Sequence, residues 1–201
     1  VAVARERGQP LVVVNALAAA RAGAHDGTHP LEVAIDALSG AGVVFVTAAG
    51  NAGGLGAHAS GVLPQTGTLQ TAKLAIYTDP VIPTDATVDI WWRATDDLVF
   101  AIQDPFGQTA IDFTPRDGQS RTTTISNGTV VTFVSSATAS GPSHGVLTLH
   151  RAMTGYTGGL RGTWTLMTRA TSLGAGDRVG QWDAWVDLDA APSVRWLTSA
   201  E

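Results

Sequence analysis

Two segments near the start of the chain consist almost wholly of apolar residues and have the length of a strand. They are the runs Leu-Val-Val-Val at residues 11–14 and Val-Val-Phe-Val at residues 43–46. Continuous apolar runs of this length are typical of strands buried on both faces of a parallel sheet. Between them, apolar residues recur with a helical period over residues 31–38. The pattern therefore predicts a parallel βαβ unit within residues 1–64.

Two strands and one helix of about three turns cannot bury their own apolar side chains, because a parallel sheet is covered by helices on both faces. We therefore expect residues 1–64 to be a slice of a larger α/β domain. The chain begins at Val1 and not at a methionine, and we expect it to be a fragment or a processed piece. Alone, such a slice would expose apolar sheet edges, and we expect it to self-associate through them.

The pattern changes at residues 65–68, after which threonine, valine, tryptophan and turn residues dominate. Short strand candidates follow at residues 69–77, 87–93, 98–103, 109–113, 121–126, 129–136, 145–151, 163–168 and 180–188. Turn signals separate them, and Asn127-Gly128 is a strong hairpin signal. Such spacing predicts an all-β jelly-roll sandwich over residues 65–192, with residues 193–201 returning to the first domain. The predicted fold class is thus an α/β slice followed by an all-β jelly-roll sandwich.

Alternation along residues 88–93 supports the sandwich, because the apolar side chains at even positions would face away from Asp89, Trp91 and Arg93. Trp164 and Leu166 are predicted to point into the core. The chain has six tryptophans, and we expect them mainly to fill the core or to pack between domains, since each buries a large apolar area. The alternative is that they line a groove for carbohydrate.

Charge and composition exclude several classes of function. The net charge is -5, with 12 Lys and Arg residues in no basic cluster, so we expect no nucleic-acid partner. No apolar run approaches the ~18 residues of a membrane span, so we expect no membrane partner. The chain has no cysteine, which excludes disulfides, a thiol nucleophile and Cys-ligated zinc. The abundance of Thr, Gly, Ala and Val is common in exported bacterial proteins, and we expect a secreted or cell-surface location.

Four aspartates near the end of the chain carry the oxygen ligands that calcium prefers. They are Asp177, Asp183, Asp187 and Asp189. They do not form a contiguous calcium-binding loop, so a solvated edge is the simpler interpretation. We expect no cofactor, with calcium as the alternative.

Three of the five histidines lie close to polar residues in the sequence. His25, Asp26 and His29 form a cluster that could hold a metal, but their position in a loop favours turn and cap hydrogen bonds. His58 and Ser60 are near neighbours along the chain, which does not by itself give the geometry of a catalytic triad. The histidines at 144 and 150 have no chemical partner nearby in the sequence.

The first 64 residues resemble the subtilisin-like serine proteases, the subtilase superfamily. The run Ala48-Ala49-Gly50-Asn51 is similar to the oxyanion-hole motif of that family. Residues 23–32, which read Gly-Ala-His-Asp-Gly-Thr-His-Pro-Leu-Glu, are similar to a loop of one branch. That branch resembles the clostridial spore-germination proteases, which carry a jelly-roll domain inserted between the oxyanion Asn and the nucleophilic Ser. Residues 65 to about 190 lie where the insert belongs.

The resemblance implies roles for particular side chains. The amide of Asn51 would donate a hydrogen bond to the oxyanion of the tetrahedral intermediate. Two opposite walls of the substrate cleft would be formed by Leu17, Ala18, Ala19, Ala48, Ala49 and Gly50. The implied partners are a polypeptide substrate and the protein's own prodomain.

The sequence departs from the family in two ways. It contains none of the motifs that carry the catalytic Asp, His and Ser, so the resemblance implies that these lie elsewhere and that the 201 residues alone are inactive. The substrate strand has Leu17-Ala18-Ala19 where the family usually has Ser-Leu-Gly, and the change from Gly to Ala could obstruct substrate pairing. We interpret the chain as part of a serine endopeptidase. The alternative is a pseudoprotease whose sandwich binds a protein partner or prodomain.

Overall fold

The computed structural model describes residues 1–16, 23, 25–50, 53–77, 85–114, 119–126, 128–136, 142–151, 160–186 and 193–197. The chain divides into two compact units, Val1–Gly53 and Gly54–Glu201. Among the described residues, the first unit holds two helices and two strands, and the second holds eleven strands.

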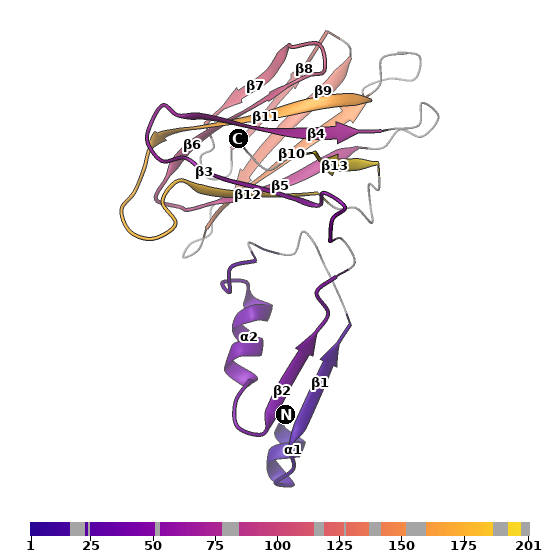
Figure 1. The fold of residues 1–201 in the computed structure, drawn as a ribbon, viewed down its shortest axis with the longest axis vertical. Helices are drawn as coiled ribbons and strands as arrows, with labels where there is room; N and C mark the ends of the chain where they lie inside the picture. The colour runs from indigo at the N-terminus through magenta and orange to yellow at the C-terminus, as the bar shows by residue number, and fades with distance from the viewer. Residues whose placement is uncertain are drawn as a thin grey trace. The chain divides into compact units, whose positions relative to one another are not determined.

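The first unit contains one pair of strands and one helix of nine residues (Figure 1). Its elements are, in order, α1 (Ala2–Glu6), β1 (Leu11–Asn15), α2 (Pro30–Leu38) and β2 (Val43–Thr47). The two strands pair in parallel, with Leu11 opposite Val43 and Asn15 opposite Thr47. Gly40 and Gly42, both with positive φ, form the tight connection between α2 and β2.

The predicted α/β slice is wrong as a description of the fold class. The described chain is mostly β, its two helices are short, and both large sheets are antiparallel. The parallel pair has only two strands, and α2 has no buried residue. Four valines on one face of the pair are 50% to 73% exposed: Val12, Val14, Val44 and Val46. An α/β fold needs a sheet covered on both faces, and these elements are too few to form those layers.

The second unit is built from two antiparallel sheets (Figure 1). Its strands are β3 (His58–Val62), β4 (Leu69–Ile76), β5 (Ala86–Trp92), β6 (Asp97–Gln103), β7 (Thr109–Phe113), β8 (Ser120–Thr124), β9 (Thr129–Ser136), β10 (Ser143–Arg151), β11 (Gly162–Ser172), β12 (Gln181–Val186) and β13 (Val194–Trp196). The six-stranded sheet has the order β3-β12-β5-β10-β9-β8, and the five-stranded sheet has the order β13-β4-β11-β6-β7.

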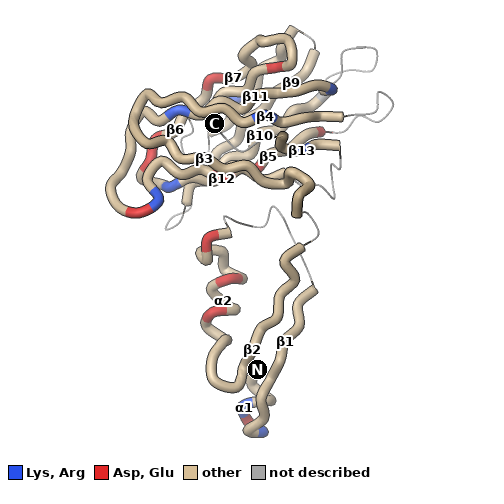
Figure 2. Tube along the Cα trace, in the orientation of Figure 1, with Lys and Arg blue, Asp and Glu red and all other residues tan. Residues whose placement is uncertain are grey.

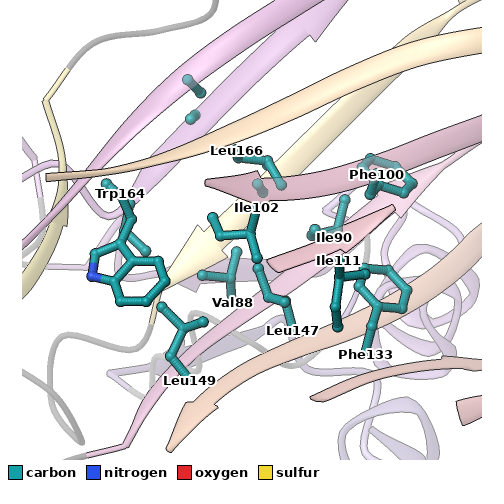
Figure 3. Packing of buried hydrophobic residues seen from close by; sticks show 14 of the residues in the cluster. Val88, Ile90, Phe100, Ile102, Ile111, Phe133, Leu147, Leu149, Trp164 and Leu166 are labelled. Carbon is teal, nitrogen blue, oxygen red and sulfur yellow. The ribbon is translucent and has the colours of Figure 1, made fainter. Parts of the chain in front are cut away.

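The two sheets share one apolar core (Figure 3). Val88 on β5 and Leu147 on β10 lie in the cluster with Ile102 on β6 and Leu166 on β11, and all four are at most 2% exposed. Trp164 is 0% exposed, and its indole N–H donates to the carbonyl of Leu160 at 2.8 Å. Burial of so large a ring stabilises the fold because its one polar atom keeps a hydrogen bond. The prediction that Trp164 and Leu166 point into the core is confirmed.

The nine strands expected from the sequence are present as β4 to β12. The sequence pattern missed β3 and β13. β3 reads His-Ala-Ser-Gly-Val and lacks a run of β-branched residues, while β13 has only three residues. β3 pairs with β12, so the six-stranded sheet begins upstream of residue 65.

Charged residues of the described chain are dispersed. Figure 2 shows acidic residues on α2 and a few Lys and Arg residues scattered over both units. No described helix has the length and apolar character required to cross a membrane.

Candidate functional site

β1 and β2 are parallel, so their carboxyl ends lie next to each other. The backbone N–H of Ala48 donates to the carbonyl of Asn15 at 3.0 Å, one residue beyond the last strand pair. Ala48, Ala49 and Gly50 then follow as exposed residues. Gly50 has φ +83°, a conformation that glycine adopts without strain. A side chain at this position would be strained, so the backbone conformation favours glycine directly before Asn51.

The structure describes only part of the predicted site. Three of its residues are described, namely Ala48, Ala49 and Gly50. The other four, Asn51, Leu17, Ala18 and Ala19, lie outside the described residues. The contact between Asn15 and Ala48 brings together the last residue of β1 and the first residue after β2. The roles of the seven residues stay predictions.

The His/Asp cluster before α2 forms turn and cap hydrogen bonds. Oδ1 of Asp26 accepts from the backbone N–H of Thr28 at 3.1 Å and from its hydroxyl at 2.6 Å. His29 is the N-cap of α2, and its own N–H donates to the carboxylate of Glu32 at 3.1 Å in a capping box. The prediction of turn and cap hydrogen bonds is confirmed for Asp26 and His29.

His58 has a carboxylate partner that is distant in the sequence. Its Nε2 lies 2.9 Å from Oδ1 of Asp183 on the adjacent strand β12. Its ring stacks on the indole of Trp185 with a centroid distance of 3.9 Å. Ser60 lies opposite Asp183 in the register of the two strands. The outer face of the six-stranded sheet thus carries a His, Asp and Trp group at its β3 edge.

A second group of the same kind lies on β5 and β10. Nε2 of His144 is 2.9 Å from Oδ1 of Asp89, and the ring of His144 stacks on Trp91 with a centroid distance of 4.0 Å. In a similar contact, Nδ1 of His150 lies 2.5 Å from Oδ1 of Asp85. These partners are 55 and 65 residues away in the chain, which is why the sequence alone offered no argument for the histidines at 144 and 150. Strand alternation did place Asp89 and Trp91 on one face, but only the register of β10 against β5 brings His144 to them.

The six tryptophans divide between the core and the outer face. Trp92, Trp164, Trp182 and Trp196 belong to the core cluster, which confirms the packing role for these four. Trp91 and Trp185 are half-buried on the outer face, and each has a histidine ring stacked on it. Carbohydrate recognition uses flat indole faces. An imidazole covers one face of each outer indole, which leaves one face of each ring for any other stacking partner.

The four aspartates considered for calcium do not gather in the described part of the chain. Asp187 and Asp189 lie outside the described residues. Asp183 contacts His58, and its Oδ2 lies 3.8 Å from Nη2 of Arg178. No three metal-ligating side chains of the described residues lie close enough together to hold an ion. Asp183 is therefore in contact with the side chains of His58 and Arg178.

Comparison with known proteins gives a likeness in fold. No protein-family model matches the sequence, and no curated protein matches it. Among solved structures, the chain is similar to the Clostridium perfringens CspB protease, with a TM-score of 0.72 and 18% sequence identity. The likeness covers 98% of this chain and 39% of that protease. At this identity the likeness shows the fold alone, and the chain spans well under half the length of the protease it resembles.

Proposed function

We propose that this chain is part of a subtilisin-like serine endopeptidase that hydrolyses peptide bonds. The observation that carries the proposal is the likeness in fold of 98% of the chain to a clostridial protease. The contact between Asn15 and Ala48 also supports it, because the chain leads from Asn15 toward one predicted wall in the sequence and Ala48 belongs to the other. The catalytic Asp, His and Ser would lie in other parts of the protein.

The exposed valines of the first unit also support the proposal. Val12, Val14, Val44 and Val46 form one apolar face of the strand pair, which we call the valine face. An exposed contiguous apolar face of this kind normally marks a surface that another part of a protein or a partner covers. In the proposed enzyme, another part of the protein would cover the valine face.

In the proposed mechanism, a serine hydroxyl attacks the peptide carbonyl while a histidine takes its proton, and the carbonyl oxygen becomes an oxyanion. The side-chain amide of Asn51 would donate a hydrogen bond to that oxyanion. Because the donor acts mainly on charge that develops in the transition state, its loss lowers the rate of the chemical step. The expected loss is about 10²–10³-fold, the range measured for the corresponding donor of subtilisin itself.

The test uses the full-length protein with any prodomain removed. We would incubate it with a fluorophosphonate, which forms a stable ester with an activated serine, and map the labelled peptide by mass spectrometry. The proposal expects rapid labelling of one serine outside the 201 residues and slower labelling in the Asn51→Ala variant. A Gly53→Ala variant provides a matched control and should be labelled at the native rate, because a Cβ at that position meets no atom within 4 Å.

The alternative function is a pseudoprotease whose second unit binds a protein partner or the prodomain. The run Leu17-Ala18-Ala19 favours it, because added methyl groups would hinder an approaching substrate backbone. A correctly folded full-length protein that shows no labelled serine outside the 201 residues would overturn the enzyme proposal and support this alternative.

A further inference from the structure

Three side chains from adjacent strands form a line on the outer face of the six-stranded sheet. They are Asp89 on β5, His144 on β10 and Ser136 on β9. Nε2 of His144 lies 2.9 Å from Oδ1 of Asp89, and Nδ1 lies 3.4 Å from Oγ of Ser136. In the register of the sheet, Ser136 is directly opposite His144, which is directly opposite Trp91. The two ring nitrogens therefore contact a carboxylate on one side and a hydroxyl on the other.

The carboxylate sets which ring nitrogen can act as a base. An ionised carboxylate only accepts hydrogen bonds, so a neutral imidazole facing Asp89 carries its proton on Nε2. Nδ1 is then left with a lone pair directed at the hydroxyl of Ser136. This is the logic of an activated serine, in which a third group orients the base.

The base is held in place while the hydroxyl is accessible. Asp89 is 3% exposed, and the side chain of His144 is 19% exposed. The ring of His144 lies nearly parallel to that of Trp91, with an interplanar angle of 18°. Ser136, the last residue of β9, is exposed. A reagent in solvent can reach the hydroxyl, whereas the histidine has little freedom to turn away.

We propose that Ser136 is a nucleophile that forms an ester with activated acyl or phosphonyl compounds. In the acyl case, Nδ1 of His144 takes the hydroxyl proton, Oγ of Ser136 bonds to the carbonyl carbon, and an aryloxide leaves. Asp89 is a positioning residue, because it acts through the imidazole. The distance of 3.4 Å is longer than a usual O–H···N bond, and such contacts often shorten only when a substrate binds. Aryl esters fit this site better than amides, since an aryloxide leaves without the protonation that an amine requires.

The test uses the 201-residue chain with 4-nitrophenyl acetate. Release of 4-nitrophenolate gives the rate, and mass spectrometry of peptides locates the acetyl group. We expect acetylation of Ser136, which Ser136→Ala abolishes. His144→Phe keeps a ring to stack on Trp91 but lacks the base, and should lower the rate about 10²-fold, within the range for general-base catalysis. Ser126→Ala is the matched control that should leave the rate unchanged, because its hydroxyl contacts Gln108 Oε1 at 2.5 Å and no histidine.

Whether Asp89 positions the imidazole of His144 is tested by a measurement other than stability. Nitrogen-15 NMR of the His144 ring distinguishes the two tautomers, and we expect the proton on Nε2 in the native chain. Asp89→Asn should change that tautomer balance and lower the acetylation rate in a protein that circular dichroism shows to be folded. Should Asp89→Asn fail to fold, His144→Phe still decides the question.

Two results would overturn the inference. One is acetylation of Ser136 no faster than that of other exposed serines, and the other is an unchanged rate in His144→Phe. Either would mean that these hydrogen bonds only join the strands. The outcome is separate from that of the proposed protease, because peptide mapping distinguishes a label on Ser136 from a label outside the 201 residues, and Ser136→Ala removes only the former.

Discussion

His58 and Asp183 are 125 residues apart in the chain, yet Nε2 of His58 lies 2.9 Å from Oδ1 of Asp183. This contact joins β3, at the edge of the six-stranded sheet, to β12. The same imidazole stacks on Trp185, so His58 makes both a polar and an aromatic contact with one neighbouring strand. β3 is short and lies at an edge, so these two side-chain contacts add to the backbone ladder that pairs it with β12.

Replacing His58 should weaken the attachment of β3. His58→Ala removes the hydrogen bond and the ring contact, and we expect a loss of about 1 kcal/mol in the free energy of unfolding, since the side chain is 35% exposed. His58→Phe keeps an aromatic ring over Trp185 and should lose only about half as much. Urea unfolding monitored by tryptophan fluorescence measures both. Equal losses in the two variants would mean that the stack contributes nothing.

Asp96 is a buried carboxylate that holds the connection between β11 and β12. It is 2% exposed and accepts from the backbone N–H groups of Gly174 at 2.7 Å and Gly180 at 2.8 Å. Asp96→Asn removes the charge and places an amide N–H against one of those donors. We expect a loss of about 1.5–3 kcal/mol in the free energy of unfolding, the range for hydrogen bonds to charged groups.

The neighbouring Asp97 provides the control for this prediction. It is exposed at the start of β6, so Asp97→Asn removes the same charge without burying an amide. We expect its free energy of unfolding to stay within about 0.5 kcal/mol of the native value. If both variants lost equal stability in urea unfolding, net charge and not the hydrogen bonds of Asp96 would be responsible.

Gly145 on β10 lies beneath an aromatic ring. A Cβ added there would stand 2.6 Å from Cε1 of Phe133, a side chain that is 1% exposed and cannot move into solvent. We expect Gly145→Ala to cost about 1–3 kcal/mol of unfolding free energy through overpacking. Gly53→Ala, where a Cβ meets no atom within 4 Å, is the control. Stability is measured by thermal unfolding. If Gly145→Ala were as stable as Gly53→Ala, the core around Phe133 would have to accept the added methyl group without cost.

The valine face should drive self-association of the isolated 201 residues. Val14 is 73% exposed and Val44 is 54% exposed, and exposed apolar faces of sheets promote association. We expect the native chain to form concentration-dependent oligomers in analytical ultracentrifugation. The double variant Val14→Thr and Val44→Thr should weaken that association about tenfold or more.

A control substitution on the second unit distinguishes association through the valine face from nonspecific association of exposed apolar residues. Val134 on β9 is 43% exposed but lies on another sheet, so Val134→Thr should leave the association unchanged. A native chain that stays monomeric at all concentrations would contradict the prediction. The prediction would also be contradicted if Val134→Thr weakened the association as much as the double variant does.

Much of the local structure follows from the sequence by itself. β7 and β9 occupy the residues predicted for them, 109–113 and 129–136, because period-two alternation and turn residues act over a few neighbours. The cap of α2 at His29 was likewise predictable, since its partners lie within three residues. The valine-rich runs correctly predicted β1 and β2 as strands. They did not reveal whether other elements cover those strands, which is why the α/β expectation was wrong.

Only the tertiary structure decided which distant side chains meet. The pairing of β10 with β5 and β9 brings His144 to Asp89 and Ser136, and the pairing of β12 with β3 brings Asp183 to His58. Strand alternation determines the face on which a side chain lies. The register between strands depends on how two whole sheets pack around Trp164 and the rest of their common core, and a shift of one residue would move every side chain to the other face.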